Sequence, residues 1–97
     1  MAIKVIVEFQ AKQGKRVELK HLLKSVAETL GPGAPGFLGS TQYEVLDNPN
    51  ILVEIADWES AEVRAVAMQK AMSSGAYAPL EELLGAPFKA TVITPLT

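Results

Sequence analysis

Apolar and polar residues alternate at the start of the chain and then change to a helical period. The alternation over residues 2–9 predicts a first strand. One face of that strand carries Ile3, Val5, Val7 and Phe9, and Ile6 falls on the other face. In residues 15–30 apolar side chains recur every three or four positions, which predicts an amphipathic helix. The apolar stripe of this helix consists of Leu19, Leu22, Leu23, Val26 and Leu30.

Glycine and proline divide the middle of the chain into a loop and a hairpin. Residues 31–36 are rich in both, and they end the helix because proline cannot continue it and glycine permits positive φ. A second strand is predicted over residues 37–46 and a third from residue 51, on either side of the turn cluster 47–50. These two strands are therefore expected to form an antiparallel hairpin.

The third strand runs into Trp58, the single tryptophan, and a helix start follows within two residues. Ser60 is expected to cap this helix with its hydroxyl, and Glu62 suits the positive end of the helix dipole. A ligand can reach an aromatic ring at such a junction, at the open end of a sheet. The alternative is that Trp58 fills the core. The helix is expected to end at residues 73–75 and to pack through Val63, Val66, Ala67 and Met68 or Ala71.

A short helix around residues 79–84 and a last strand over residues 88–94 complete the pattern. The order is typical of the α+β class, namely the ferredoxin-like split βαβ arrangement (βαββαβ) with a four-stranded antiparallel sheet, and residues 1–97 form one domain of this kind. Two helices cover one sheet face, yet residues 51–56 are apolar on both faces. A homodimer with the two sheets packed face to face would bury the second face, and the alternative is a monomer with that face partly exposed.

Charge and composition narrow the function classes. The formal net charge is −2 and the basic residues are dispersed, so no basic stripe indicates a nucleic-acid partner. No segment approaches the roughly 20 apolar residues of a membrane span, and we expect a cytoplasmic protein without membrane contact. The chain has no cysteine and one histidine, and no glycine-rich turn follows a strand. Neither a metal nor a dinucleotide cofactor is therefore expected.

Five short segments, in order over nearly the whole chain, carry a family resemblance. They are Val5-Ile6-Val7-Glu8-Phe9 followed by Lys12-Gln13-Gly14-Lys15, then Pro35-Gly36-Phe37-Leu38-Gly39-Ser40, Asn48-Pro49-Asn50 and Trp58-Glu59-Ser60-Ala61-Glu62. In this order they resemble the antibiotic biosynthesis monooxygenase family of the dimeric α+β barrel superfamily. The resemblance implies a dimeric α+β barrel with a pocket between the sheet and the helices of each subunit.

The resemblance also implies a reaction and a set of site residues. Family members let molecular oxygen react directly with a bound aromatic polyketide or hydroquinone, without flavin or metal, while the protein supplies a dry cavity and orienting hydrogen bonds. Trp58 is the expected catalytic residue, through ring stacking and its indole N–H. The expected substrate-binding residues are Phe9, Tyr43, Glu54, Met68, Met72 and Tyr77. Each of the aromatic and methionine side chains has the alternative of being an ordinary core residue.

The chain departs from its relatives at two places. Many relatives carry a histidine in the second helix, where this chain has Ala67 and Met68. Haem-degrading relatives carry an asparagine in the first strand, and none is present here. Haem degradation is therefore not expected. His21 lies opposite the apolar stripe of the first helix and is expected to be solvated rather than catalytic.

Glu54 stands in an otherwise apolar strand and has two interpretations. It is either a carboxylate at an edge or dimer interface, paired with a basic group, or a base in the pocket with a raised pKa. Two functions stay open at this point. The first is a cofactor-independent monooxygenase that acts on a small quinol or anthrone-like aromatic. The second is a non-catalytic dimeric barrel that binds a small apolar ligand.

Overall fold

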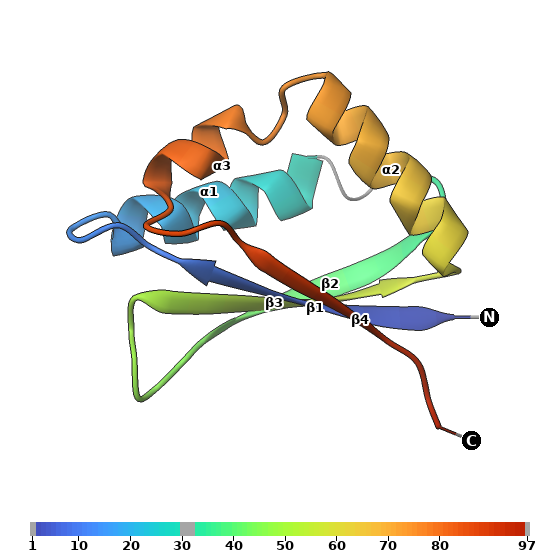
Figure 1. Cartoon of the computed structure of the whole chain (residues 1–97), viewed down its shortest axis with the longest axis horizontal. Helices are drawn as coiled ribbons and strands as arrows, with labels where there is room; N and C mark the ends of the chain where they lie inside the picture. Colours follow the sequence, from blue (N-terminus) through green and yellow to red (C-terminus); the bar gives the residue numbers. More distant parts are fainter. Residues whose placement is uncertain (1, 30–32, 97) are drawn as a thin grey trace.

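The computed structural model describes residues 2–29 and 33–96, which form one antiparallel sheet with helices on one side (Figure 1). The strands lie in the order β2-β3-β1-β4. The elements are β1 (Ile3–Gln10), α1 (Arg16–Thr29), β2 (Phe37–Glu44), β3 (Ile51–Trp58), α2 (Ala61–Ser73), α3 (Ala78–Leu83) and β4 (Lys89–Ile93). The predicted α+β class and ferredoxin-like element order are confirmed. Leu30 of the predicted stripe and residues 31–32 of the predicted loop lie outside the described residues.

Strand β1 is internal and carries the inner face predicted from its alternation. Its residues Ile3, Val5, Val7 and Phe9 are all buried. The register with β3 places Trp58 opposite Ile3 and Glu54 opposite Val7. Since directly opposite residues share a face of the sheet, Trp58 and Glu54 both lie on the side that the helices cover.

Helices α1 and α3 close one end of this covered face. Leu19 is fully buried and Leu23 nearly so, as expected for the centre of the apolar stripe of α1. Leu80 of α3 is also buried, and a bridge between Ala11 and Leu84 ties the segment after α3 to the end of β1. The dense part of the core therefore sits under these two helices.

Helix α2 packs less closely and corrects one expectation. None of its residues is buried, although Val63, Ala67 and Met68 do contact the core. Val66, which was expected to pack inward, is 67% exposed. Alanine and valine occur on several sides of this helix, so its sequence does not define a single inner face. The inner face is defined only by the position of the helix against the sheet.

No helix within the described residues covers the other face of the sheet (Figure 1). Ile6 of β1 lies opposite Ile55 of β3 on this uncovered face. Val53, two residues before Ile55 in β3, lies on the same face. An exposed ion pair joins Lys4 Nζ to Asp57 Oδ1 at 2.6 Å on the same face. Among residues 2–29 and 33–96, no helix is long and apolar enough to cross a membrane.

Candidate functional site

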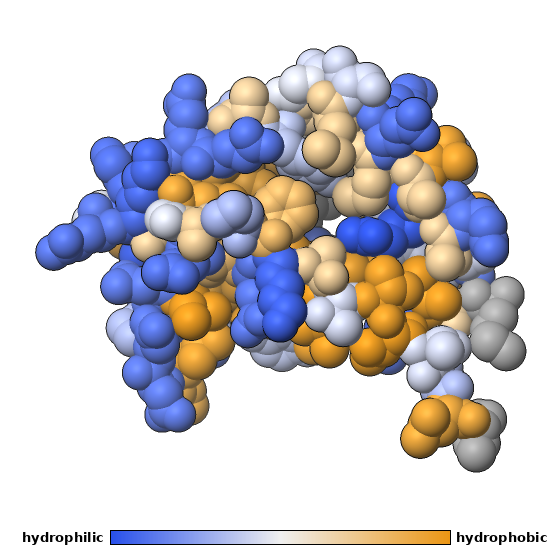
Figure 2. Space-filling view, in the orientation of Figure 1, coloured by the Kyte–Doolittle hydropathy of each residue, from blue (hydrophilic) through white to orange (hydrophobic). Residues whose placement is uncertain are grey.

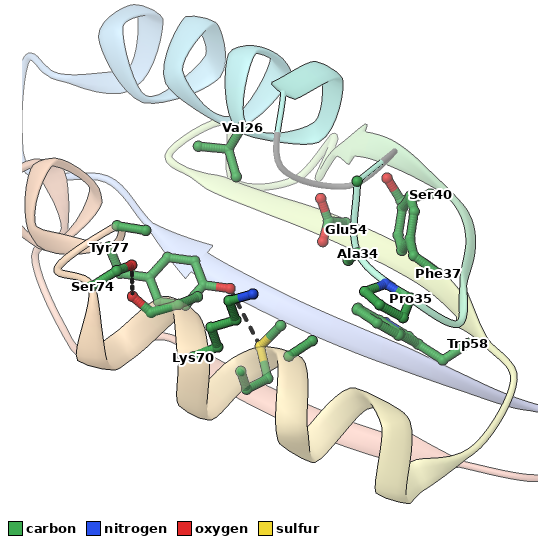
Figure 3. Close-up of a pocket in the computed structure, with 15 residues that line it drawn as sticks. Val26, Ala34, Pro35, Phe37, Ser40, Glu54, Trp58, Lys70, Ser74 and Tyr77 are labelled. Atoms are coloured by element: carbon green, nitrogen blue, oxygen red, sulfur yellow. Dashed lines mark hydrogen bonds between the residues drawn. The ribbon is translucent and has the colours of Figure 1, made fainter.

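A cavity of about 300 Å³ lies between the sheet and α2. Figure 2 shows the molecule hollowed at this level, with hydrophobic residues along the sheet side of the hollow. The close-up in Figure 3 shows side chains from the sheet, from α2 and from the loop before β2 converging on it. The volume is at the small end of the range of about 300–1,000 Å³ that is usual for ligand sites.

The sheet wall follows from strand register. Glu54 and Trp58 of β3 are four residues apart and share the covered face, with Ala56 between them. On β2, Ser40 lies opposite Ala56 and Phe37 opposite Trp58. Glu54, Trp58, Ser40 and Phe37 all line the cavity. The hairpin thereby places one carboxyl, one hydroxyl and two aromatic rings side by side.

The loop before β2 forms a second wall. Gly36 adopts a φ of +82°, a left-handed conformation that glycine accepts without strain. Its carbonyl accepts a hydrogen bond from the N–H of Glu59 at 2.9 Å, which ties the loop to the end of β3. Ala34 and Pro35 are held over the cavity as a result (Figure 3).

Helix α2 and its exit form the third wall. The Ser60 hydroxyl caps the helix by accepting from the N–H of Val63 at 3.2 Å, as expected from the sequence. The helix presents Ala67, Met68, Lys70 and Ala71 to the cavity. Just after α2, the Tyr77 hydroxyl donates to Met68 Sδ at 3.3 Å. A thioether is a weak acceptor, so a ligand oxygen in the cavity would be a better partner for this hydroxyl.

Burial changes the acidity of two groups that line the cavity, Glu54 and Tyr77. Burial raises the pKa of the Glu54 carboxyl, and a hydrogen bond from Gln42 Nε2 to Glu54 Oε2, 3.0 Å long, partly opposes the rise. Burial also raises the pKa of Tyr77, the negative charge of Glu54 raises it further, and Arg64 opposes the change. Glu54 is thus a carboxyl that binds a proton more firmly than an exposed one, and Tyr77 stays a hydrogen-bond donor.

The structure corrects the edge interpretation of Glu54. Strand β3 lies between β2 and β1, so it is an internal strand. The carboxylate faces the helices, and its hydrogen-bond partner is the neutral amide of Gln42 rather than a basic group. Glu54 belongs to the cavity.

Four of the seven residues predicted for the site line this cavity, and three do not. Trp58, Glu54, Met68 and Tyr77 are in its walls. Phe9 lies in the core, where its ring is 5.9 Å from that of Phe88. Tyr43 lies opposite Val53 on the uncovered face and is 49% exposed. Met72 is 65% exposed on α2. Phe9 shares the covered face with Glu54 and Trp58 but lies farther along the sheet, opposite Leu52. Strand parity turns Tyr43 away from the cavity, and helix rotation exposes Met72.

Trp58 combines both interpretations that the sequence left open. It is only 5% exposed and belongs to the core cluster, yet part of its surface lines the cavity. Sequence reasoning missed Phe37, Ser40, Pro35 and Lys70 as lining residues. A hairpin register counted outward from the turn could have found Ser40, since it lies on the same face as Glu54 and Trp58.

The cavity wall offers few oxygen atoms that could bind a metal ion, and no histidine is among its described residues. His21 is exposed on α1, as predicted, and does not line the cavity. Within the described part of the chain, no three histidine, aspartate or glutamate side chains gather where they could hold a metal ion. What the arrangement offers chemically is one carboxyl that can accept a proton, hydroxyl donors, the ammonium group of Lys70 and an apolar aromatic surface.

Comparisons with known proteins identify relatives of this arrangement. A family model described as antibiotic biosynthesis monooxygenase matches residues 2–78. A monooxygenase from the ActVA-Orf6 gene of Streptomyces coelicolor, solved with nanaomycin D, has 25% identity and a TM-score of 0.82 over 99% of this chain and 88% of its own.

Two further solved structures share the fold. Rv0793 from Mycobacterium tuberculosis has 24% identity and a TM-score of 0.82, covering 100% of this chain and 97% of its own. SnoaB, a cofactor-independent oxygenase from Streptomyces nogalater, has 19% identity and a TM-score of 0.82 over 99% of this chain and 94% of its own. No curated protein matches the sequence.

Proposed function

The chain belongs to the antibiotic biosynthesis monooxygenase family, and we propose that it is a cofactor-independent monooxygenase for a small hydroxylated aromatic, a quinol or anthrone-like compound. The observation that carries the proposal is the half-buried carboxyl of Glu54 in the wall of a mostly apolar cavity that also holds Trp58 and Tyr77. Such a cavity suits a flat, weakly acidic ring that must lose a proton away from water.

The first step is proton removal by Glu54. The substrate hydroxyl, or the acidic ring C–H of an anthrone, gives its proton to the carboxylate, and the substrate becomes an electron-rich anion. Tyr77 stabilises the developing negative charge because its hydroxyl can leave the weak acceptor Met68 Sδ and donate to the substrate oxygen. Trp58 supports the ring by stacking, with its indole N–H as a further donor.

The second step is direct oxidation of that anion by molecular oxygen. The anion is the reductant, so no flavin, haem or metal is needed. A new carbon–oxygen bond forms at the ring carbon to give a peroxide. Cleavage of the O–O bond leaves one oxygen atom on carbon as a carbonyl and releases the other as water, with both hydrogens coming from the substrate. The protein supplies orientation and excludes water.

Similar proteins support this proposal. The ActVA-Orf6 monooxygenase was solved with nanaomycin D bound, and SnoaB, which shares the fold, is a cofactor-independent oxygenase. The second candidate function is non-catalytic binding of a small apolar ligand. It is favoured by Ala67 and Met68, which line the cavity where many relatives carry a histidine.

The proposal includes a homodimer formed through the uncovered face of the sheet. Ile6, Val53 and Ile55 supply apolar surface there, and packing against the same sheet face of a second copy would bury it. The cytoplasmic location stays a prediction from the sequence.

Oxygen uptake with a panel of hydroquinones and anthrones tests the proposal and separates the two functions. Purified protein pretreated with a chelator should consume oxygen, with the rate rising with pH as Glu54 and the substrate ionise. Glu54→Gln should lower kcat/KM by about 100-fold or more, the usual contribution of a general base. His21→Ala should change it less than about tenfold.

Two results would contradict the monooxygenase. Ligand binding without oxygen uptake for any member of the panel would favour the non-catalytic barrel. Activity that is lost on chelation and restored by a metal, or stoichiometric haem binding with a Soret band, would require a different mechanism.

A further inference from the structure

Gln42 of β2 directs both hydrogens of its side-chain amide at groups in the cavity wall. Its Nε2 donates to Glu54 Oε2 at 3.0 Å and to Ser40 Oγ at 3.2 Å. Ser40 and Glu54 line the cavity, whereas Gln42 is exposed and does not line it. The amide therefore contacts two residues of the cavity wall without taking up space in the cavity.

Strand register explains why one side chain reaches both groups. Gln42 lies opposite Glu54 across the β2 and β3 ladder, and Ser40 is two residues earlier on the same face of β2. The orientation of the amide follows from chemistry, because an ionised carboxylate only accepts hydrogen bonds. If the amide were reversed, its carbonyl oxygen would face a carboxylate oxygen and repel it.

The other groups around Glu54 do not replace this hydrogen bond. On β1 its neighbour is Val7, and from α1 the cavity receives Val26. The charged or titratable groups on the helical side are Tyr77, Lys70 and Arg64. Among the described residues, none of these forms an ion pair or hydrogen bond with Glu54.

We propose that Gln42 is a positioning residue for the base: it holds the Glu54 carboxylate in one orientation, anchored also to Ser40, and favours the ionised form that accepts the substrate proton. This inference rests on the proposed function for the role of Glu54 as base. One carboxylate oxygen is bound to Gln42, and the other is left for the substrate hydroxyl. A merely structural role would require only the shape of the Gln42 side chain, whereas this role requires its N–H donors.

Two variants at position 42 separate shape from donor chemistry. Gln42→Glu keeps the shape and places a second carboxylate beside Glu54, and Gln42→Leu removes the donors and the polarity. Gln69→Leu is the matched control, since Gln69 is an exposed glutamine on α2 outside the cavity wall. Gln42 is itself exposed, so its variants should fold.

The direct measurement is the titration of the Glu54 carboxyl by carbon-13 NMR, assigned with Glu54→Gln. In Gln42→Leu the titration midpoint should rise by about half a pH unit to one pH unit, a roughly threefold to tenfold change in proton affinity, because a hydrogen bond to the charged form is lost. It should rise further in Gln42→Glu and stay unchanged in Gln69→Leu. The acidic limb of kcat should move by the same amount, with KM changed less than about twofold.

Each outcome decides the inference. A Glu54 midpoint that is the same in wild type and Gln42→Leu overturns it, whatever the activity, because the shift in Gln42→Glu can come from repulsion between the two carboxylates alone. A midpoint that shifts as expected supports the action of Gln42 on Glu54, even if the wild type consumes no oxygen. A shifted midpoint without oxygen consumption would therefore contradict the proposed monooxygenase and leave the role of Gln42 supported.

Discussion

The ring of Phe37 meets the indole of Trp58 edge to face, with the ring centroids 5.2 Å apart and the planes inclined by 69°. The two residues lie opposite each other at the end of the β2 and β3 ladder, where a register shift follows Phe37. This contact holds the indole at one orientation beside the cavity. Trp58, which the sequence analysis predicted as a site residue, is thus positioned by Phe37, which it did not predict.

Phe37→Leu should lower the free energy of unfolding by about 1–1.5 kcal/mol, because an edge-to-face aromatic contact and some buried area are lost. It should also change the fluorescence of Trp58, which reports alone since the chain has one tryptophan. Urea denaturation followed by fluorescence measures both. Phe88→Leu removes a ring that contacts Phe9 and Tyr77 instead, so it should lower stability without altering native emission. Identical emission in the Phe37 variant would contradict the described contact.

Gly36→Ala should destabilise the protein by about 2–4 kcal/mol. A left-handed φ costs a non-glycine residue about 1–2 kcal/mol, and the new Cβ would also overlap Cγ1 of Val63 at the start of α2. Gly14→Ala is the control, since Gly14 has nearly the same φ with nothing within 4 Å of the added Cβ. Thermal unfolding should show a smaller loss for Gly14→Ala. Combining Gly36→Ala with Val63→Ala should recover the part that is due to overlap, and no recovery would show that the backbone alone is responsible.

Glu54→Gln should make the protein more stable near neutral pH and not at low pH. Burial raises the pKa of Glu54 in the folded state above its ordinary value of 4.5. The folded state therefore binds the proton more firmly than the unfolded state. The contribution of Glu54 to stability is fully present below pH 4.5 and is lost as the pH rises through the raised pKa.

Urea unfolding of wild type and Glu54→Gln across this range measures the difference. The gap in unfolding free energy should be smallest below pH 4.5 and grow as the pH rises. Gln69→Leu, a change at an exposed uncharged residue of α2, should show no such trend. A gap that shrinks with rising pH would mean that the folded protein favours the ionised form of Glu54.

A charge on the uncovered sheet face should dissociate the proposed homodimer. Ile55→Lys places an ammonium group at the centre of that face, opposite Ile6, and sedimentation equilibrium at micromolar concentration should then give the monomer mass. Val66→Lys introduces the same charge on the exposed side of α2 and should leave the mass unchanged. A wild-type monomer mass would remove the dimer from the proposal.

Several features of this protein follow from its sequence alone because they depend on local chemistry. The alternation of Val5 and Val7 requires an extended strand with one buried face, and the helical repeat through Leu19 and Leu23 requires a helix on that face. Ser60 caps α2 because a hydroxyl at this place satisfies a free N–H whatever the surrounding fold. The order of these elements was enough to predict the ferredoxin-like arrangement.

Only the tertiary structure decided which side chains share the cavity. Tyr43 and Gln42 are neighbours in one strand, yet register sends Tyr43 to the uncovered face and Gln42 to the carboxyl of Glu54. Val66 and Ala67 are neighbours in one helix, and the rotation of α2 against the sheet exposes the first and turns the second inward. Strand pairing and helix rotation are set by contacts between distant segments, and a one-residue change in either reverses which side chains face inward.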